Sequence, residues 1–314
     1  MIRASLKEMF MRFFNSGVSM ALLGIFFSHL AHAAQPSSSD TPQRWVSAGG
    51  ALTEWVVALG GQSRLVGVDS TSQYPQALRS LPSIGYQRQL SSEGILSLRP
   101  DVLVGTEEMG PPPVLEQLRA AKVRVEALPA DADLATLKSN LQRLGVLLGA
   151  QEQADRLIES YQQQMDNQQK WIAQAQKDGA TPGVLLLVGH GGGKPMVAGK
   201  GTAGDWLIRQ AGGRNLATHD GYKVFSVEAM AGLAPQVLVV ADRTLRGEAA
   251  RKALFKENLA LAATPAARDD RLFDLDPTLL VGGLGPRLPE SLQALSQALY
   301  PAAKPLSAAV RSAP

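Results

Sequence analysis

Short apolar runs alternate with longer amphipathic segments from residue 44 to about residue 130. The runs are rich in Val and Leu, as in strands buried within a sheet, whereas the longer segments repeat their apolar residues at helical spacing. Because strands and helices alternate, this pattern predicts a parallel sheet covered by helices. The predicted strands are 44–49, 65–69, 101–106 and 123–128, and the predicted helices are 51–60, 91–99 and 112–122.

A long helical stretch follows residue 131. Its second part, residues 150–177, contains neither Pro nor Gly. At 1.5 Å per residue this part would extend about 42 Å, which exceeds the width of a small domain. We therefore predict a single long helix that joins two lobes.

The alternation resumes after residue 179. The fold class predicted is therefore α/β, with two lobes that each contain a central parallel sheet and that are joined by the long helix. The predicted strands of the second half are 183–189, 236–242 and 271–276, and the predicted helices are 201–213, 226–233, 247–264 and 288–300.

The first 33 residues have the pattern of a secretory signal peptide. Three basic residues precede an apolar run of about ten residues, half of what a membrane span needs, and "AHA" supplies small residues for cleavage. The predicted organisation is a signal peptide (1–33), a flexible leader (34–43), an N-terminal lobe (44–149), an interlobe helix (150–178), a C-terminal lobe (179–302) and a flexible tail (303–314).

Composition narrows the location and the chemistry. The chain has no Cys, so neither a disulfide nor a lipid-modified cysteine is expected, and we predict a periplasmic protein without a lipid anchor. Loss of residues 1–33 would lower the formal charge from +3 to about +1, and no basic block indicates nucleic acid. It would also leave only His190 and His219, too few for a closed site for zinc or manganese.

One segment recurs. "SSEGILSLRPDVLV" begins at Ser91, and "SVEAMAGLAPQVLV" begins at Ser226, while "GYQR" precedes only the first copy. Each Ser is placed to cap a helix, each Glu (Glu93 and Glu228) falls in the first turn, and each Pro ends the helix before a strand. The start and end signals of a helix explain most of this pattern. They leave unexplained why each lobe has a Glu at the equivalent position.

Four motifs together resemble one class of periplasmic substrate-binding proteins, class III, which serve importers of haem, siderophores and cobalamin. They are "TEWVVALGGQSRLVGVD", "EGILSLRPDVLV", "GTAGDWLIRQAGGRNLA" and "GGLGPRLPESLQAL". The resemblance implies two α/β lobes tied by a long helix and no enzymatic activity. It also implies that Glu93 and Glu228 dock against arginines of an inner-membrane ABC permease, which works with its ATPase.

Tyr86, in "GYQRQLS", is the candidate iron ligand. It follows Gly85 at the strand-to-helix edge of the first lobe, where open α/β folds bind ligands. On its own, a Tyr-x-Arg sequence is more often a half-buried tyrosine beside a surface arginine than a ligand site. The stretch resembles haem-binding members of Gram-negative haem-uptake systems, which implies haem b as cargo, Tyr86 as the axial ligand and Arg88 as the residue that favours its phenolate.

Other residues are weaker candidates for contact with the cargo. Tyr74 precedes Pro75 and has no arginine two residues away, so we rank it second as ligand and expect it to line the cleft. Arg243 follows a predicted strand of the second lobe, and the resemblance implies that it contacts a propionate or the distal face; Arg246 is the alternative. His190 is a candidate ligand for a second haem, and Lys194 and Lys200 are candidate propionate contacts.

The glycine-rich segment after residue 188 fails as a P-loop, since neither Gly-Lys pair is followed by Ser or Thr. A secreted hydrolase is disfavoured because the chain lacks a G-x-S-x-G elbow. The sequence thus predicts a monomeric periplasmic carrier that delivers haem to a permease, with an outer-membrane haem receptor system upstream of it. A ferric-siderophore or cobalamin carrier on the same fold is the alternative.

Overall fold

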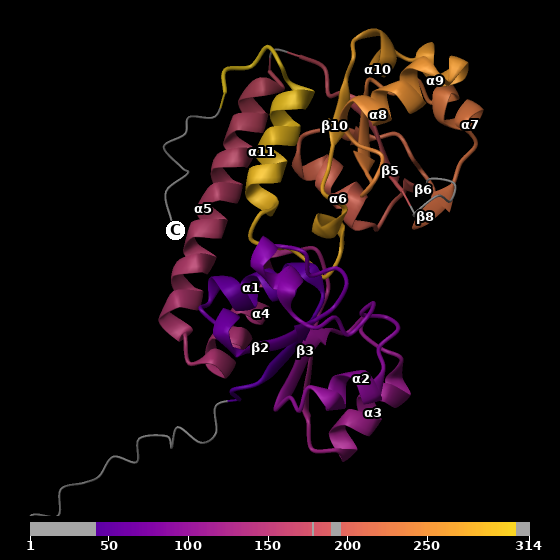
Figure 1. The fold of residues 1–314 in the computed structure, drawn as a ribbon. Coiled ribbons are helices and arrows are strands. Elements are labelled where there is room, and N and C mark those ends of the chain that lie inside the picture. Colours follow the sequence, from indigo (N-terminus) through magenta and orange to yellow (C-terminus); the bar gives the residue numbers. More distant parts are fainter. Residues whose placement is uncertain (1–41, 178, 190–195, 306–314) are drawn as a thin grey trace, which may run out of the picture. The chain divides into compact units, whose positions relative to one another are not determined.

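The structure is a computed structural model, and it describes residues 42–177, 179–189 and 196–305. These belong to one compact unit, residues Thr41–Pro314. No helix in these ranges is both long and apolar enough to cross a membrane. The predicted fold class, α/β, is confirmed. The structure contains two sheets, and Figure 1 colours the chain so that the strands of each can be traced along the sequence.

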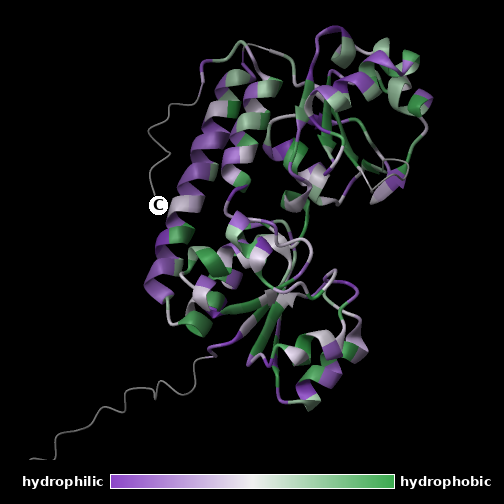
Figure 2. Ribbon diagram, in the orientation of Figure 1, coloured by the Kyte–Doolittle hydropathy of each residue, from purple (hydrophilic) through white to green (hydrophobic). Residues whose placement is uncertain are grey.

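The first sheet has four parallel strands in the order β2-β1-β3-β4. All residues of β1 and β3 are buried, which explains why these strands are continuous apolar runs. Figure 2 shows the strands of the sheets as largely hydrophobic. The strands are β1 (Trp45–Ala48), β2 (Leu65–Val68), β3 (Val102–Thr106) and β4 (Arg124–Leu128); the helices of this region are α1 (Gly50–Ala58), η1 (Gln62–Arg64), η2 (Gln76–Ser80), α2 (Ser92–Ser97), α3 (Pro112–Ala120) and α4 (Leu134–Leu148).

The second sheet has six strands, in the order β10-β9-β5-β6-β8 with β7 also paired to β5. The expectation of a parallel sheet holds for β5, β7, β9 and β10, but β6 pairs antiparallel with both of its neighbours, β5 and β8. Three-residue strands such as β6 and β8 are too short to produce a readable period. The strands are β5 (Gly183–Val188), β6 (Met196–Ala198), β7 (Arg214–Asn215), β8 (Tyr222–Val224), β9 (Val237–Ala241) and β10 (Leu272–Asp274).

The predicted long helix is present as α5 (Gln151–Ala175), and Gly149, with φ +70°, separates it from α4. Its buried residues recur at three- and four-residue spacing and pack against α4 and against α11 (Leu288–Leu299). Figure 1 shows α5 and α11 side by side. Gln168 of α5 donates a hydrogen bond to the Ser296 hydroxyl of α11, so polar as well as apolar contacts fix this pair.

One predicted helix, 247–264, is wrong as a single element. It is divided into α8 (Gly247–Arg251), a π-helical turn (Lys252–Lys256) and α9 (Leu259–Ala262), and a separate helix, α10 (Pro265–Arg268), begins just after its predicted end. Asn258 and Thr264 interrupt the helix because their side chains accept hydrogen bonds from backbone N–H groups and so start new helices. The remaining helices are α6 (Ala203–Gln210), α7 (Val227–Gly232) and η4 (Pro277–Leu280).

The recurring segment folds in the same way twice, and its predicted caps are confirmed. The Ser91 hydroxyl accepts from the Gly94 N–H at the start of α2, and the Ser226 hydroxyl accepts from the Ala229 N–H at the start of α7. After each helix, one residue has positive φ immediately before the proline: Arg99 with 47° and Ala234 with 48°.

The segment after β10 contacts α1 through buried polar groups. The Trp55 indole N–H donates to the Leu284 carbonyl at 2.7 Å, and the Arg287 guanidinium bonds the Glu54 carboxylate at 2.5 Å. Arg287 also donates to Asp276 at 2.8 Å. The Glu54 side chain is only 4% exposed, and its burial raises its pKa even though Arg287 acts to lower it. Removing Arg287 would therefore leave a buried, uncompensated carboxylate.

We predict that Arg287→Met lowers the free energy of unfolding by about 3–5 kcal/mol at neutral pH. Without the guanidinium, the folded-state pKa of Glu54 lies still further above its unfolded value. The protonated folded form is then favoured, so the contribution of Glu54 to stability is greatest below its unfolded pKa and is lost as pH rises through its folded pKa. Urea denaturation at about pH 5 and about pH 8 measures this slope. The double variant Glu54→Gln/Arg287→Met should lose the slope, and a slope that persists there would contradict this explanation.

Candidate functional site

The residues around the first sheet form the first region, and those around the second sheet form the second region. Residues from both regions line one cavity of about 590 Å³, a size within the range of small-molecule sites. One side comes from the loops after β3 and β4, and the other from the start of α6, from β8 and from the segment 279–288. Charged and apolar groups are mixed on its wall. The lining includes Arg88, Glu107, Glu108, Asp131, Trp206, Arg209, Tyr222, Leu279, Leu280, Leu284 and Leu288.

The loop of Tyr86 is fixed by its backbone. The Ile84 N–H donates to Val68 at 3.0 Å, and the Gly85 carbonyl accepts from the Ser70 N–H at 2.8 Å. Gly85 has φ +84°, which favours glycine at this position. Gln87 is fully buried, so the residues on either side of it are turned outward, and Tyr86 is 39% exposed. The loop thus presents Tyr86 and Arg88 together.

Arg88 contacts a carboxylate in this structure. Its guanidinium donates to Glu108 at 2.6 Å, and this hydrogen bond is the main reason that its pKa is raised, with smaller contributions from Tyr86 and Tyr222. The two side chains are 53% and 35% exposed, so the pair is readily solvated and weak. Arg88 is therefore close enough to one tyrosine of each region to interact with it electrostatically, and its carboxylate partner is partly exposed to solvent.

Sequence reasoning overlooked Tyr222. It is 37% exposed on β8, lines the cavity and follows Gly221, whose φ is +72°. Burial raises the pKa of its hydroxyl more than the Gly204 N–H and the Thr202 hydroxyl lower it. The signal was available in the sequence: a Gly-Tyr dipeptide precedes the second copy of the recurring segment as well as the first. The tyrosine lies five residues before Ser91 in the first copy and four residues before Ser226 in the second, so the two dipeptides differ by one residue in register.

Arg243 reaches the loop of Tyr86 from the second region. Its guanidinium lies 3.4 Å from the Ser70 carbonyl, and the Ser70 N–H is the group that donates to Gly85. Arg246 is an exposed residue at the start of α8. Of the two candidate arginines, Arg243 is thus the one brought close to Tyr86 through described contacts.

The remaining candidates are distributed more widely. Tyr74 is 50% exposed, and the Arg287 guanidinium lies 4.4 Å from its ring centroid, a cation–π contact. Lys200 is exposed beside Gly201, which lines the cavity. His190 and Lys194 lie outside the described residues. Within the described ranges, no group of three or more His, Asp and Glu could hold a metal ion.

Glu93 and Glu228 are both exposed in the first turn of their helices, α2 and α7. The pKa of Glu228 is lowered by its own backbone N–H and by the Ser226 hydroxyl, so this carboxylate is held ionised. The two regions therefore present one acidic side chain each from an equivalent structural position.

Three Asp-x-Thr turns follow strands of the two sheets: Asp69-Ser70-Thr71, Asp242-Arg243-Thr244 and Asp276-Pro277-Thr278. In each turn the Asp carboxylate accepts from both the backbone N–H and the hydroxyl of the Thr. Asp69 is 1% exposed and also accepts from the Gly49 N–H and the Ser72 hydroxyl, so a single carboxylate satisfies four donors.

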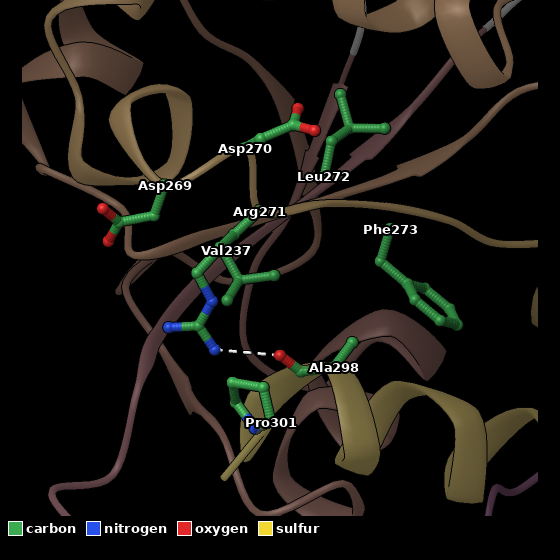
Figure 3. Close-up of a pocket in the computed structure, with 8 residues that line it drawn as sticks. All are labelled: Val237, Asp269, Asp270, Arg271, Leu272, Phe273, Ala298 and Pro301. Atoms are coloured by element: carbon green, nitrogen blue, oxygen red, sulfur yellow. Dashed lines mark hydrogen bonds between the residues drawn. The ribbon is translucent and has the colours of Figure 1, made fainter.

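A second cavity, of about 460 Å³, lies at the N-terminal ends of two strands. Among its lining residues, Val237 begins β9 and Leu272 begins β10. Figure 3 shows Arg271 extended across it toward Ala298. The guanidinium donates to the Ala298 and Leu299 carbonyls at 2.9 and 2.8 Å, and so caps the end of α11. Because this arginine is engaged in stabilising a helix terminus, we take the first cavity as the candidate site.

A family model described as periplasmic binding protein matches residues 46–279. The chain belongs to this family. A crystal structure of a periplasmic haem-binding protein from Pseudomonas aeruginosa is 64% identical, with a TM-score of 0.81, over 85% of this chain and 95% of that one. The haem-binding protein HutB of Vibrio cholerae is 35% identical, with a TM-score of 0.72, over 82% and 99%.

The family also includes relatives with other cargo. The vitamin B12-binding protein of Pectobacterium atrosepticum is 26% identical over 56% of this chain and 62% of its own length. The fold predicted from the alternating pattern, two α/β regions joined by a long helix, matches that of the Pseudomonas aeruginosa binding protein. Family membership therefore establishes the architecture, while the cargo depends on the cavity of the individual member.

We predict that Asp69→Ala lowers the free energy of unfolding by about 2–4 kcal/mol, since four buried donors lose their acceptor. Asp133→Ala is the matched control, because Asp133 accepts from the Thr136 N–H and hydroxyl in an exposed N-cap, where the loss should be about 1 kcal/mol. Urea denaturation compares the two. Equal losses would contradict the special role of Asp69.

Proposed function

We propose that this periplasmic binding protein captures haem between its two α/β regions and delivers it to an inner-membrane ABC permease. The observation that carries the proposal is the pairing of an exposed Tyr86 with Arg88 on a fixed loop. The 64% identity with a periplasmic haem-binding protein supports the same cargo. A ferric-haem carrier needs an anionic ligand, and a tyrosinate oxygen is one of the known axial ligands of haem iron.

Tyr86 would coordinate the iron as tyrosinate. A free tyrosine has a pKa of about 10, so ionisation at neutral pH needs help. Fe(III) supplies most of it, and a neighbouring guanidinium favours the phenolate further. Arg88 is available for this role because its bond to Glu108 is partly exposed. Binding would then exchange one anionic partner of Arg88 for another.

The rest of the cavity suits a flat apolar molecule with acidic edges. Trp206, Leu280 and Leu284 provide apolar surface, and Tyr222 faces Arg88 from the second region. Arg243 and Lys200 are the proposed contacts of the propionates, or of the distal face in the case of Arg243. Tyr74 would form an aromatic wall, and a second haem held by His190 stays a prediction.

Glu93 and Glu228 would orient the loaded protein on the permease. Each is exposed, and each occupies the same place in its own region. Individual exposed ion pairs contribute less than about 1 kcal/mol, so such contacts set orientation and association rate more than affinity. The proposed protein acts in the periplasm by binding rather than by catalysis.

We predict that purified protein mixed with haemin gives a tyrosinate-type, high-spin ferric absorbance spectrum and that Tyr86→Phe abolishes it. Loss of the proposed anionic axial ligand should weaken haemin binding by about tenfold or more, that is, by at least about 1.4 kcal/mol. Tyr74→Phe is the matched control, because Tyr74 is similarly exposed, and it should retain the wild-type spectrum. An unchanged spectrum in Tyr86→Phe would refute the coordination, and tight binding of cyanocobalamin in place of haemin would favour the alternative cargo.

We predict that Glu93→Arg/Glu228→Arg reduces haem delivery to the cognate permease and ATPase in proteoliposomes by about tenfold, because reversed charges repel the docking arginines. The haem spectrum of this variant should match that of the wild type. Glu116→Arg/Glu159→Arg is the control, since both residues are exposed on other helices, α3 and α5. Equal transport by both double variants would eliminate the docking role.

A further inference from the structure

We infer that Asp242 is a positioning residue whose buried carboxylate fixes the turn that carries Arg243 and so directs the guanidinium toward the loop of Tyr86. This inference rests on the proposed function, in which Arg243 contacts the cargo. It adds a residue that does not itself touch haem. The contacts of the turn carry the argument.

The Asp242 carboxylate holds its turn through one oxygen. Oδ1 accepts from the Thr244 N–H at 2.6 Å, from the Thr244 hydroxyl at 2.8 Å and from the Leu245 N–H at 2.8 Å. Asp242 is only 8% exposed, so these bonds are shielded from water. Three donors on one buried acceptor leave the backbone between residues 242 and 245 little freedom.

The other carboxylate oxygen is packed against backbone. A Cβ atom built on Gly189, at the end of β5, would lie 1.4 Å from Oδ2 of Asp242. Only glycine leaves room for the carboxylate at this place. The turn is therefore fixed from two directions, by donors ahead of it and by close packing from the neighbouring strand.

Arg243 depends on this turn because its own contact is weak. It is exposed, and its one described hydrogen bond, to the Ser70 carbonyl, is 3.4 Å long. An arginine side chain loses much rotamer entropy when it is held in one conformation, so this contact alone would not hold it. The backbone direction set by Asp242 limits where the guanidinium can go.

The partner of Arg243 is held by the same device. Ser70 is the middle residue of the Asp69 turn, as Arg243 is the middle residue of the Asp242 turn. The Ser70 N–H donates to Gly85, the residue before Tyr86. Two buried aspartates thus hold the two residues, Arg243 and Ser70, that contact each other next to the loop of the proposed iron ligand.

A double-mutant cycle tests the inference with haemin titration of the purified protein. Asp242→Ala and Arg243→Ala should each weaken haemin binding by about tenfold, and the double variant should be no weaker than Arg243→Ala, since Asp242 acts only through that side chain. Additive losses, or wild-type binding by Asp242→Ala, would overturn the inference. Wild-type protein that fails to bind haemin would instead refute the proposed function.

Three further variants separate positioning from general damage. Asp242→Asn keeps an oxygen that can accept the three hydrogen bonds and should restore binding to within about twofold of wild type. Gly189→Ala pushes the carboxylate aside and should reproduce the loss seen in Asp242→Ala. Asp133→Ala removes a similar Asp-Thr contact from an exposed N-cap and should bind haemin normally.

Hydrogen exchange of the cargo-free protein measures how well the backbone amides of the Asp242 turn are protected when no haem is bound. The Thr244 and Leu245 amides should exchange about tenfold faster in Asp242→Ala and at nearly the wild-type rate in Asp242→Asn, because the amides lose their acceptor only in the first. Unchanged exchange in Asp242→Ala would overturn the inference even if the variant binds less haemin. Faster exchange, together with the non-additive cycle, supports it.

Discussion

The hydrogen bonds accepted by aspartates after the ends of the strands are the constraint on which the candidate site depends. Strands such as β3 and β9 are buried along their whole length and offer no polar side chain to a ligand except where they end. The chain must leave the sheet there, and its freed backbone N–H groups need acceptors. Asp69, Asp242 and Asp276 provide them, so hydrogen bonds within the protein hold the turns that carry Ser70, Arg243 and Thr278.

A Gly-Tyr dipeptide precedes both copies of the recurring segment, and both tyrosines lie near the candidate site. In both regions a glycine with positive φ precedes a tyrosine, and a serine-capped helix with an exposed Glu follows. The two tyrosines have diverged in surroundings: Tyr86 lies beside Arg88 on an outward-facing loop, while Tyr222 sits near the start of α6, where burial raises its pKa. An asymmetric pair is what a ligand with one anionic coordination position requires, because a second tyrosinate would add uncompensated charge.

Local signals predicted the fold and part of the site. The caps of α2 and α7, the long helix and the parallel strands follow from short-range pattern, which explains why they were predictable. The bond of Arg88 to Glu108, the reach of Arg243 to Ser70 and the Arg287 pair with Glu54 join residues far apart in sequence, so no local pattern encodes them. The short strands β6 and β8, and with them Tyr222, were missed for a related reason, since three residues cannot establish a period.

Two ion pairs illustrate how the protein can be stable and yet release its cargo. Glu54 and Arg287 are largely buried, and separating them would strand a carboxylate in a poorly solvated place, at a cost of several kcal/mol. Arg88 and Glu108 are half exposed, and separating them costs less than about 1 kcal/mol because water solvates both. An arriving anionic ligand can therefore take Arg88 from Glu108 at little cost, whereas it cannot disturb the contact between α1 and the segment after β10. Binding would change the second pair and leave the first intact, which favours exchange of side-chain partners over large movement of the two regions.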